Sequence, residues 1–144
     1  MTGTRRLDPA AALVREARRA RGRAYAPYSR FKVGAAVLAA SGAVVSGCNV
    51  ENASYGLSIC AERAAIQRAV AEGRRRLRII AVVGGRTGVL PCGACRQVMH
   101  EFGITHVVTA GPTGPHRTYA LTDLLGHAFG PADLAAGSPR RGRR

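Results

Sequence analysis

The sequence predicts an α/β architecture in which helices pack against a mixed β-sheet. Segments with helical periodicity alternate along the chain with short strand-like runs, in the order helix, strand, strand, helix, strand, helix, strand. The runs 31–40 and 43–50 are separated only by a tight turn at Ser41-Gly42, so they form an antiparallel hairpin. The apolar run 77–83 contains β-branched residues, which is typical of a buried central strand.

The first helix is predicted to begin near Pro9, because proline suits the first helical turn, and to extend to about Arg23. It carries a thin apolar stripe and is therefore a surface helix. The stripe consists of Leu13, Val14, Ala17 and Ala20. Pro27 blocks helix continuation, so 25–29 is predicted as a loop. In the following strand, one face is expected to carry Phe31, Val33, Ala35 and Val37.

The second half of the chain alternates helices with strands, and a glycine follows each of its two main helices. The elements are helix 60–72, strand 77–83, helix 92–102, strand 104–109 and a short edge strand 117–120. Thr122 is predicted to cap a short helix that ends at Leu125. After Pro131 the residues are small and basic, which predicts a frayed end.

The length of 144 residues fits one domain, which we assign to residues 1–137, with 138–144 as a basic, disordered tail. Apolar residues make up 47% of the chain, enough for a packed core. No stretch approaches the roughly 20 apolar residues of a membrane span, and no apolar run follows the first arginines as in a secretory signal. We therefore expect a cytoplasmic protein without a membrane partner.

The net charge of +14 makes nucleic acid a candidate partner. The arginines, however, gather in the first helix, at 74–78 and at the C-terminus, as expected for solvated faces and a tail. Aromatic residues are only 5% and tryptophan is absent, so few rings are available for stacking on single strands. Nucleic-acid binding is disfavoured, although a zinc-stabilised nucleic-acid-binding module stays open as an alternative.

Three of the four cysteines stand at predicted helix starts. Cys60 begins one helix, and Cys92 and Cys95 open the next, three residues apart, so both thiols can face one side. Helix N-termini stabilise thiolates, and three thiolates leave one position open on a tetrahedral zinc ion, as in catalytic sites. The Cys-x-x-Cys pair alone also fits redox pairs and structural zinc sites. Cys48 is expected to be a small core residue.

A water molecule on such a zinc ion needs a general base, and Glu62 is the candidate. Positions two apart on a helix diverge by roughly 200°, so Cys60 must lie at or before the cap for Glu62 to turn into the same pocket. Without the neighbouring cysteine motifs, Glu62 is predicted to be a solvated helix residue. The joint pattern of Cys60-Ala61-Glu62 and, about thirty residues later, Pro91-Cys92-Gly93-Ala94-Cys95 matches the three-cysteine signature of zinc deaminases.

With these motifs the sequence resembles small, three-cysteine, homotetrameric cytidine deaminases over residues 24–134. The matching blocks are APYSRFKVGAA (26–36), GCNVENASY (47–55), CAER (60–63) and PCGACRQ (91–97). The resemblance implies an α/β/α fold with a five-stranded mixed sheet and helices on both faces. It also implies a hydrolase of pyrimidine salvage that converts cytidine and 2′-deoxycytidine to uridine and 2′-deoxyuridine plus ammonia.

The same resemblance implies the roles of the central residues. Cys60, Cys92 and Cys95 would ligate Zn²⁺. Zinc-bound hydroxide would attack C4 of the base, while Glu62 shuttles protons to N3 and to the leaving ammonia. Three thiolates give the zinc site a formal charge of about −1, which a guanidinium donating to the sulfurs offsets; Arg63 fills that role, and Arg96 is a weaker second candidate.

Substrate contacts are implied by the resemblance as well. Asn49 and Glu51 would hydrogen-bond the ribose 3′-hydroxyl, Phe31 would pack beside the base, and the N–H of Ala61 would hold the pyrimidine O2. Without the resemblance, the residue types alone predict a polar turn at Asn49 and Glu51 and a core position for Phe31.

Two aromatic residues are expected to reach the site of a neighbouring subunit. Tyr55 and Phe129 resemble residues presented across an interface, so the homotetramer would have shared active sites. Gly126 stands where the family pattern has proline, which bears on the position of Phe129.

A deaminase for a nucleoside antibiotic or a free base remains an alternative. The ribose block Asn49-Val50-Glu51-Asn52 argues against it, and recognition of a free 3′-hydroxyl argues against a polymer substrate.

Overall fold

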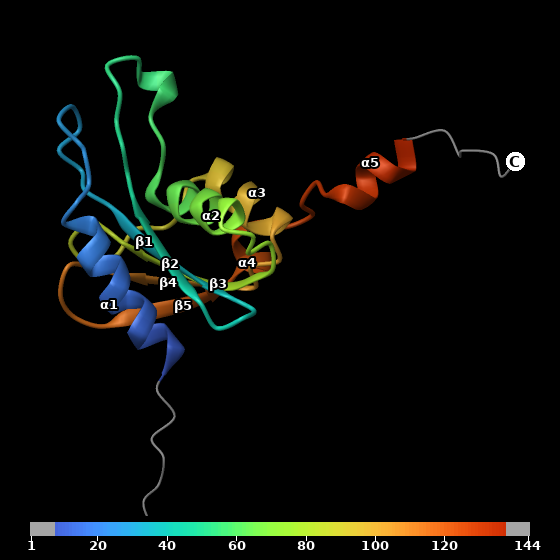
Figure 1. Cartoon of the computed structure of the whole chain (residues 1–144), viewed down its shortest axis with the longest axis horizontal. Coiled ribbons are helices and arrows are strands. Elements are labelled where there is room, and N and C mark those ends of the chain that lie inside the picture. Colours follow the sequence, from blue (N-terminus) through green and yellow to red (C-terminus); the bar gives the residue numbers. More distant parts are fainter. Residues whose placement is uncertain (1–7, 138–144) are drawn as a thin grey trace, which may run out of the picture.

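The computed structural model describes residues 8–137 and contains a five-stranded mixed sheet in the order β2-β1-β3-β4-β5 (Figure 1). The strands are β1 (Gly34–Ala39), β2 (Val44–Cys48), β3 (Leu77–Val83), β4 (His106–Ala110) and β5 (His116–Ala120). Only β3 and β4 are parallel; every other neighbouring pair is antiparallel. The predicted mixed sheet, its hairpin and its central strand are confirmed. The tail 138–144 lies outside the described residues.

Helices cover both faces of this sheet, as expected. The helices of the described residues are α1 (Pro9–Arg21), α2 (Ala61–Ala71), α3 (Gly93–Glu101), α4 (Leu121–Leu124) and α5 (Pro131–Gly137), with a 3₁₀ turn η1 (Tyr55–Leu57), and all but α5 pack near the sheet. The predicted stripe of α1 is buried on one face, against alternate residues of β1, β3 and β4. The larger core on the opposite face joins the sheet to α2, α3 and α4. Because strand side chains alternate, β1 and β3 serve both cores.

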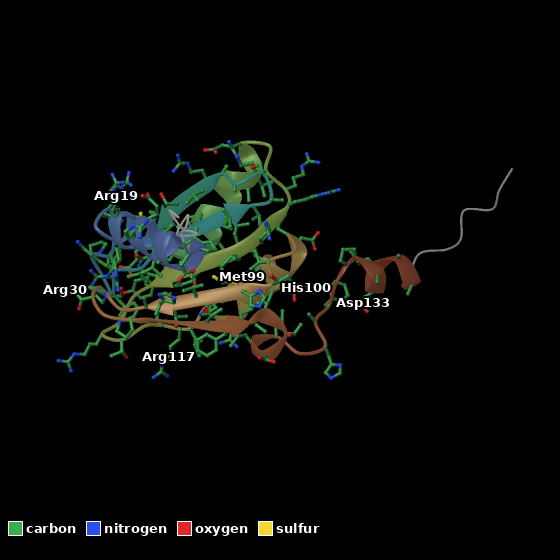
Figure 2. All side chains as sticks on the ribbon, turned by 90° about the horizontal axis from the view of Figure 1, so that it is seen from below. Arg19, Arg30, Met99, His100, Arg117 and Asp133 are labelled. Atoms are coloured by element: carbon green, nitrogen blue, oxygen red, sulfur yellow. The ribbon has the colours of Figure 1, made fainter. Side chains whose placement is uncertain are left out.

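Several arginine side chains point outward from this body, whereas the larger core is closed to solvent. Arg19, Arg30 and Arg117 extend away from the sheet, while Met99 of α3 lies inside (Figure 2). These positions agree with the prediction that the excess positive charge lies on solvated faces.

The hairpin begins later than the pattern predicted. Residues 31–33 are not part of β1, because the side-chain amide of Asn49 hydrogen-bonds the backbone there, accepting from Val33 N and donating to Phe31 O. Phe31 is consequently 45% exposed and does not share the buried face of Val33. The interpretation of Phe31 as a core residue is wrong for this reason.

Three further predictions are wrong. Thr122 lies inside α4, whose cap position is Ala120. Residues 131–137 form helix α5 instead of fraying, because Pro131 suits the first turn and Asp133 Oδ2 accepts from Gly130 N at 2.7 Å. This helix projects from the body (Figure 1). Cys48 is only half-buried and packs in neither core cluster, since it ends the edge strand β2.

Gly47 of β2 fixes how closely α2 approaches the sheet. A Cβ atom there would lie 2.5 Å from the backbone nitrogen of Ala65 and 3.0 Å from the carbonyl carbon of Ala64. These are backbone atoms of α2, so they cannot rotate away. The close approach seats the helix whose start carries Cys60.

We predict that Gly47→Ala lowers the free energy of unfolding by roughly 1–3 kcal/mol, because α2 must move off the sheet. Urea titration measures this change. Gly56→Ala is the matched control, since a Cβ atom at Gly56 meets nothing within 4 Å. Equal stability of the Gly47→Ala variant and the control would contradict the close approach.

Candidate active site

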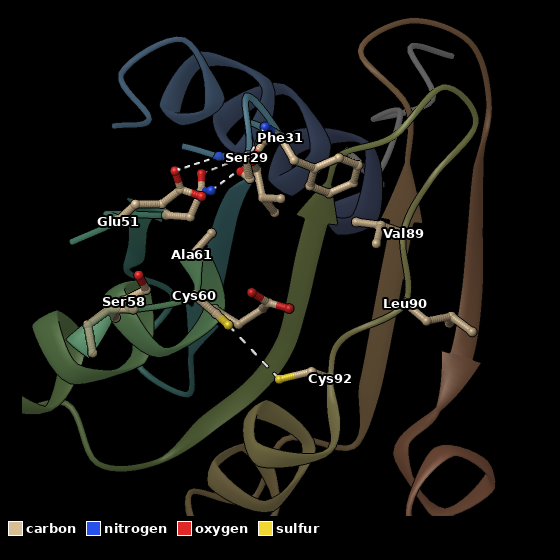
Figure 3. A pocket seen from close by; sticks show the side chains of 13 residues that line it. Ser29, Phe31, Glu51, Ser58, Cys60, Ala61, Val89, Leu90 and Cys92 are labelled. Carbon is tan, nitrogen blue, oxygen red and sulfur yellow. Dashed lines mark hydrogen bonds between the residues drawn. The ribbon is translucent and has the colours of Figure 1, made fainter. Parts of the chain in front are cut away.

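Three cysteine sulfurs converge where α2 and α3 begin. Cys60 and Cys92 are the N-cap residues of the two helices, with extended backbone, and Cys95 lies in the first turn of α3. Their Sγ atoms all lie within 4.8 Å of one another, with 4.0 Å between Cys60 and Cys92 and 3.5 Å between Cys92 and Cys95. Figure 3 shows the first pair at the floor of a pocket. Within residues 8–137 this is the one group of three or more potential metal ligands.

The spacing of these sulfurs fits zinc. Zn–S bonds of about 2.3 Å in tetrahedral geometry place two sulfurs about 3.8 Å apart, and the observed 3.5 and 4.0 Å lie on either side of that value. Thiolates are soft ligands that zinc favours, and two helix N-termini favour negative charge at this point. Three protein ligands leave a fourth position for a water molecule or substrate.

The thiols are electrostatically coupled. The pKa of Cys60 is lowered to about 5, first because Cys95 donates a hydrogen bond to it and further because Arg63 and Cys92 do so. The pKa of Cys95 is raised, because its proton is held in the bond to Cys60 and because the thiol is buried. Negative charge therefore develops first on Cys60.

Arg63 is the cation next to the sulfurs. It lies one helical turn after Cys60 and brings Nη2 to 3.8 Å from the Cys60 sulfur, while its buried Nε has no hydrogen-bond partner among the described residues. The weaker candidate Arg96 does not reach the sulfurs. Its guanidinium donates instead to the carbonyl oxygens of Pro91 at 2.8 Å and Leu124 at 2.7 Å, which ties the turn before Cys92 to α4.

Glu62 is buried beside the sulfurs, with 5% of its surface exposed, and lines the pocket. For Glu62 to face the same pocket as Cys60, that cysteine must lie at or before the helix cap. The structure meets this requirement, because Cys60 is the N-cap and Glu62 is the second residue of the helix. The pKa of Glu62 is raised to about 7, chiefly by burial and also by the charge of Cys60, whereas its backbone hydrogen bond and Arg63 oppose the shift. A carboxyl group with this pKa both accepts and donates protons near neutrality.

The pocket above the sulfurs has a volume of about 320 Å³, the size of a small-molecule site. Figure 3 shows the Phe31 ring extending toward Val89 across the pocket. The complete lining is Ser29, Phe31, Val33, Asn49, Glu51, Ser58, Ile59, Cys60, Ala61, Glu62, Val89, Leu90 and Cys92. Sequence reasoning missed Val89 and Leu90, although their position directly before the Pro91-Cys92 motif is a usable signal.

The side chains of Asn49 and Glu51 also hydrogen-bond the backbone of residues 28–33, the segment of the pocket that carries Phe31. Glu51 Oε1 accepts from the backbone nitrogens of Tyr28 at 2.9 Å and Ser29 at 3.1 Å. The Ser29 side chain, which also hydrogen-bonds this carboxylate, is the main cause of the lowered pKa of Glu51. Sequence reasoning missed Ser29.

Tyr55 and Phe129 do not line the pocket within one chain. Tyr55, on η1, is 75% exposed and packs edge-on against Tyr28 with 5.8 Å between ring centroids. Phe129 is 56% exposed, and its carbonyl oxygen accepts from Gln97 Nε2. Both aromatic rings are therefore available on the surface.

The family model of the cytidine and deoxycytidylate deaminase zinc-binding region matches residues 8–111. The chain belongs to this family. A cytidine deaminase of Halalkalibacterium halodurans is 49% identical over 125 residues, which are 85% of this chain and 95% of that protein. The crystal structure of a cytidine deaminase from Burkholderia pseudomallei superposes with a TM-score of 0.78 at 52% identity, covering 83% of this chain and 98% of that one.

The cytidine deaminase structure from Mycobacterium tuberculosis has a TM-score of 0.72 at 45% identity and covers 83% of this chain and 96% of that one. With the sulfur cluster, these relationships identify the chain as a zinc-dependent deaminase with the expected α/β fold. Across residues 8–137, no helix combines the length and the apolar character needed to cross a membrane.

We predict that the purified protein holds one zinc ion per chain and that Cys95→Ser loses most of it, because one buried sulfur ligand is removed. Elemental analysis after dialysis measures the ratio. Cys48→Ser is the matched control, since Cys48 lies outside the sulfur cluster, and it should retain zinc. Equal zinc loss in the two variants would contradict the assigned cluster.

Glu62 should also affect the stability of the zinc-stripped protein. Its pKa rises from 4.5 to about 7 on folding, so the folded state favours the protonated form. Relative to Glu62→Gln, the wild type should lose about 3 kcal/mol of unfolding free energy as the pH rises from about 4.5 to about 7. Urea titrations at several pH values measure this difference; parallel curves for the two proteins would contradict the burial of a titrating carboxyl group.

Proposed function

We propose that the protein catalyses the hydrolytic deamination of cytidine and 2′-deoxycytidine to uridine and 2′-deoxyuridine, with release of ammonia. The observation that carries this proposal is a buried Glu62 with a pKa near neutrality beside three clustered sulfurs. The named cytidine deaminases that the chain resembles support the choice of substrate. We place the reaction in cytoplasmic pyrimidine salvage.

Zinc, when bound by Cys60, Cys92 and Cys95, supplies a Lewis acid that lowers the pKa of water and so provides a nucleophile near neutral pH. Arg63 reduces the excess negative charge of the thiolates through its contact with Cys60.

Glu62 moves the protons of the reaction. Its carboxylate takes one proton from the attacking water and delivers it to N3, as a bond forms between the water oxygen and C4. It then takes the second proton of that oxygen and gives it to the amino group, so that the C4–N bond breaks and ammonia leaves. Each proton that Glu62 accepts is returned within the cycle, which requires a pKa near the working pH.

The pocket walls orient the nucleoside. Phe31 packs beside the base, and the Ala61 N–H at the start of α2, where helical N–H groups lack intrahelical partners, donates to O2. Asn49 and Glu51 bind the ribose 3′-hydroxyl. An analogue without that hydroxyl leaves polar groups of the site without a partner, which is a strong basis for rejection.

Oligomerisation completes the site in this proposal. The exposed rings of Tyr55 and Phe129 reach the pockets of neighbouring subunits in a homotetramer. A single chain leaves both rings outside its own pocket, which is consistent with this arrangement.

We predict that the zinc-loaded wild type converts cytidine to uridine and that Glu62→Gln lowers kcat by roughly 10²–10⁴-fold, because the amide cannot move protons. The fall in cytidine absorbance measures the rate, and zinc content should stay unchanged. Glu16→Gln on α1 is the control, since its carboxylate pairs with Arg19 on the surface.

Three outcomes would contradict the proposal. Full activity of Glu62→Gln would remove the proton shuttle. Preference for cytosine over cytidine would make the protein a free-base deaminase. Salt-sensitive binding of RNA by a wild type that leaves cytidine unchanged would favour the nucleic-acid-binding alternative.

A further inference from the structure

A second pocket lies beside the loop 84–91, whose residues Val89 and Leu90 line both this pocket and the active site (Figure 3). Its volume is about 490 Å³, larger than the 320 Å³ of the active-site pocket. We propose that this second pocket binds a sugar phosphate, whose phosphate group is held by two arginines. The polar side chains of its lining are those of Arg86, Thr87, Thr109, Thr113, Arg117 and Tyr119.

The floor of the second pocket comes from two neighbouring strands. Thr109 of β4 and Arg117 of β5 are direct cross-strand partners, so their side chains leave the same face of the sheet, with Cβ atoms about 5 Å apart. Tyr119 lies two residues after Arg117 on β5 and therefore shares that face. The sheet thus brings a hydroxyl, a guanidinium and a phenol to one side of the pocket.

The loop 84–91 packs closely over this floor. A Cβ atom at Gly111, just after β4, would collide with the carbonyl oxygen of Arg86, so the two backbones are in direct contact. A Cβ atom at Gly88 would lie 3.4 Å from Thr109 Oγ1. Gly88 has φ of 124°, a conformation that favours glycine, and the missing side chain leaves the Thr109 hydroxyl uncovered.

The turn between β4 and β5 is fixed from outside the pocket. The Arg18 guanidinium of α1 donates to the carbonyl oxygen of Gly111 at 3.1 Å and to that of Gly114 at 2.7 Å. This turn contributes Thr113 to the lining. A site whose backbone is already held loses less conformational entropy when a ligand binds.

The charge of the second pocket is purely positive. Its lining contains no aspartate or glutamate, and none of the ion pairs among residues 8–137 involves Arg86 or Arg117. Both arginines are exposed, so their long side chains are free to turn onto a ligand. A guanidinium donates two parallel hydrogen bonds to phosphate oxygens. Two of them match a phosphate monoester, which carries nearly two negative charges at neutral pH.

The threonines favour a ligand that carries hydroxyl groups as well. Thr109 is buried, with 5% of its surface exposed, yet its hydroxyl hydrogen-bonds no other described residue. A buried hydroxyl without a partner is costly, and a ligand hydroxyl relieves that cost. Thr87 and Thr113 add exposed hydroxyls at the mouth. Because hydroxyl groups both donate and accept, these three side chains suit the hydroxyls of a sugar.

Calorimetric titration of the zinc-loaded protein with ribose 5-phosphate tests the site. We expect one ligand per chain. Arg86→Gln and Arg117→Gln should each raise Kd roughly tenfold, because each removes charge-assisted hydrogen bonds to the phosphate. Thr109→Val, which keeps the shape of the side chain but not the hydroxyl, should raise Kd about fivefold. Inorganic phosphate should bind more weakly than ribose 5-phosphate, and ribose should not bind.

Arg75→Gln is the matched control and should leave Kd unchanged. Arg75 is also exposed and outside the ion pairs of the described residues, but it precedes β3, whereas the loop 84–91 follows that strand. The control removes the same charge, so general attraction to a chain of net charge +14 would weaken equally in all three arginine variants. Zinc content and the thermal midpoint of every variant show that the fold is kept.

Three outcomes would overturn this inference. The first is no binding of ribose 5-phosphate, or an equal Kd for the wild type, Arg86→Gln and Arg117→Gln. The second is equal affinity for inorganic phosphate and ribose 5-phosphate, which would limit the site to the free ion. The third is binding that survives both arginine substitutions but is lost when zinc is removed, which would place the phosphate on the metal. Because calorimetry measures binding alone, a failure to deaminate cytidine would leave this inference standing.

Discussion

The chemistry of this protein depends on two helices that begin at the same point. Because Cys60 and Cys92 occupy N-cap positions, their extended backbone places both sulfurs at the helix ends, where free N–H groups favour negative charge. The distance between α2 and the sheet is set by small residues, because Gly47 of β2 and Ala65 of α2 bring backbone against backbone. A larger side chain at either position would separate α2 from the sheet and Cys60 from the other sulfurs.

The same arrangement explains why one carboxyl group has a pKa near neutrality. Glu62 follows the first sulfur by two residues, so it shares the buried side of the helix start with a thiolate. Burial and the charge of Cys60 both favour its protonated form, while Arg63 opposes them. Arg63 thus serves two groups at once, because it also stabilises the negative charge of the Cys60 sulfur.

The sequence predicted those features whose cause is local. The strand 77–83 was predicted with its observed bounds, because its apolar pattern alone determines burial. The start of α2 was predicted to within one residue, and its geometric requirement, Cys60 at the cap, follows from helical spacing. The candidate ligands and Glu62 were predicted for the same reason, since they lie in short motifs.

The features that could not be predicted have distant causes. Phe31 leaves the strand because the side chain of Asn49, eighteen residues later, hydrogen-bonds its backbone, and no periodicity records such a contact. Val89 and Leu90 join the pocket through a loop whose path depends on the sheet. The roles of Tyr55 and Phe129 depend on a second copy of the chain, so they stay predictions.

Asn49 and Glu51 hold the backbone of the pocket, and in the proposed function they also bind the ribose. Their side chains hydrogen-bond the backbone on both sides of Arg30, which has a left-handed conformation with φ of 57°. In the proposed function, a substitution at Glu51 therefore removes a ligand contact and also releases the backbone of residues 28–33, which carries Phe31. Loss of activity in such a variant mixes both effects.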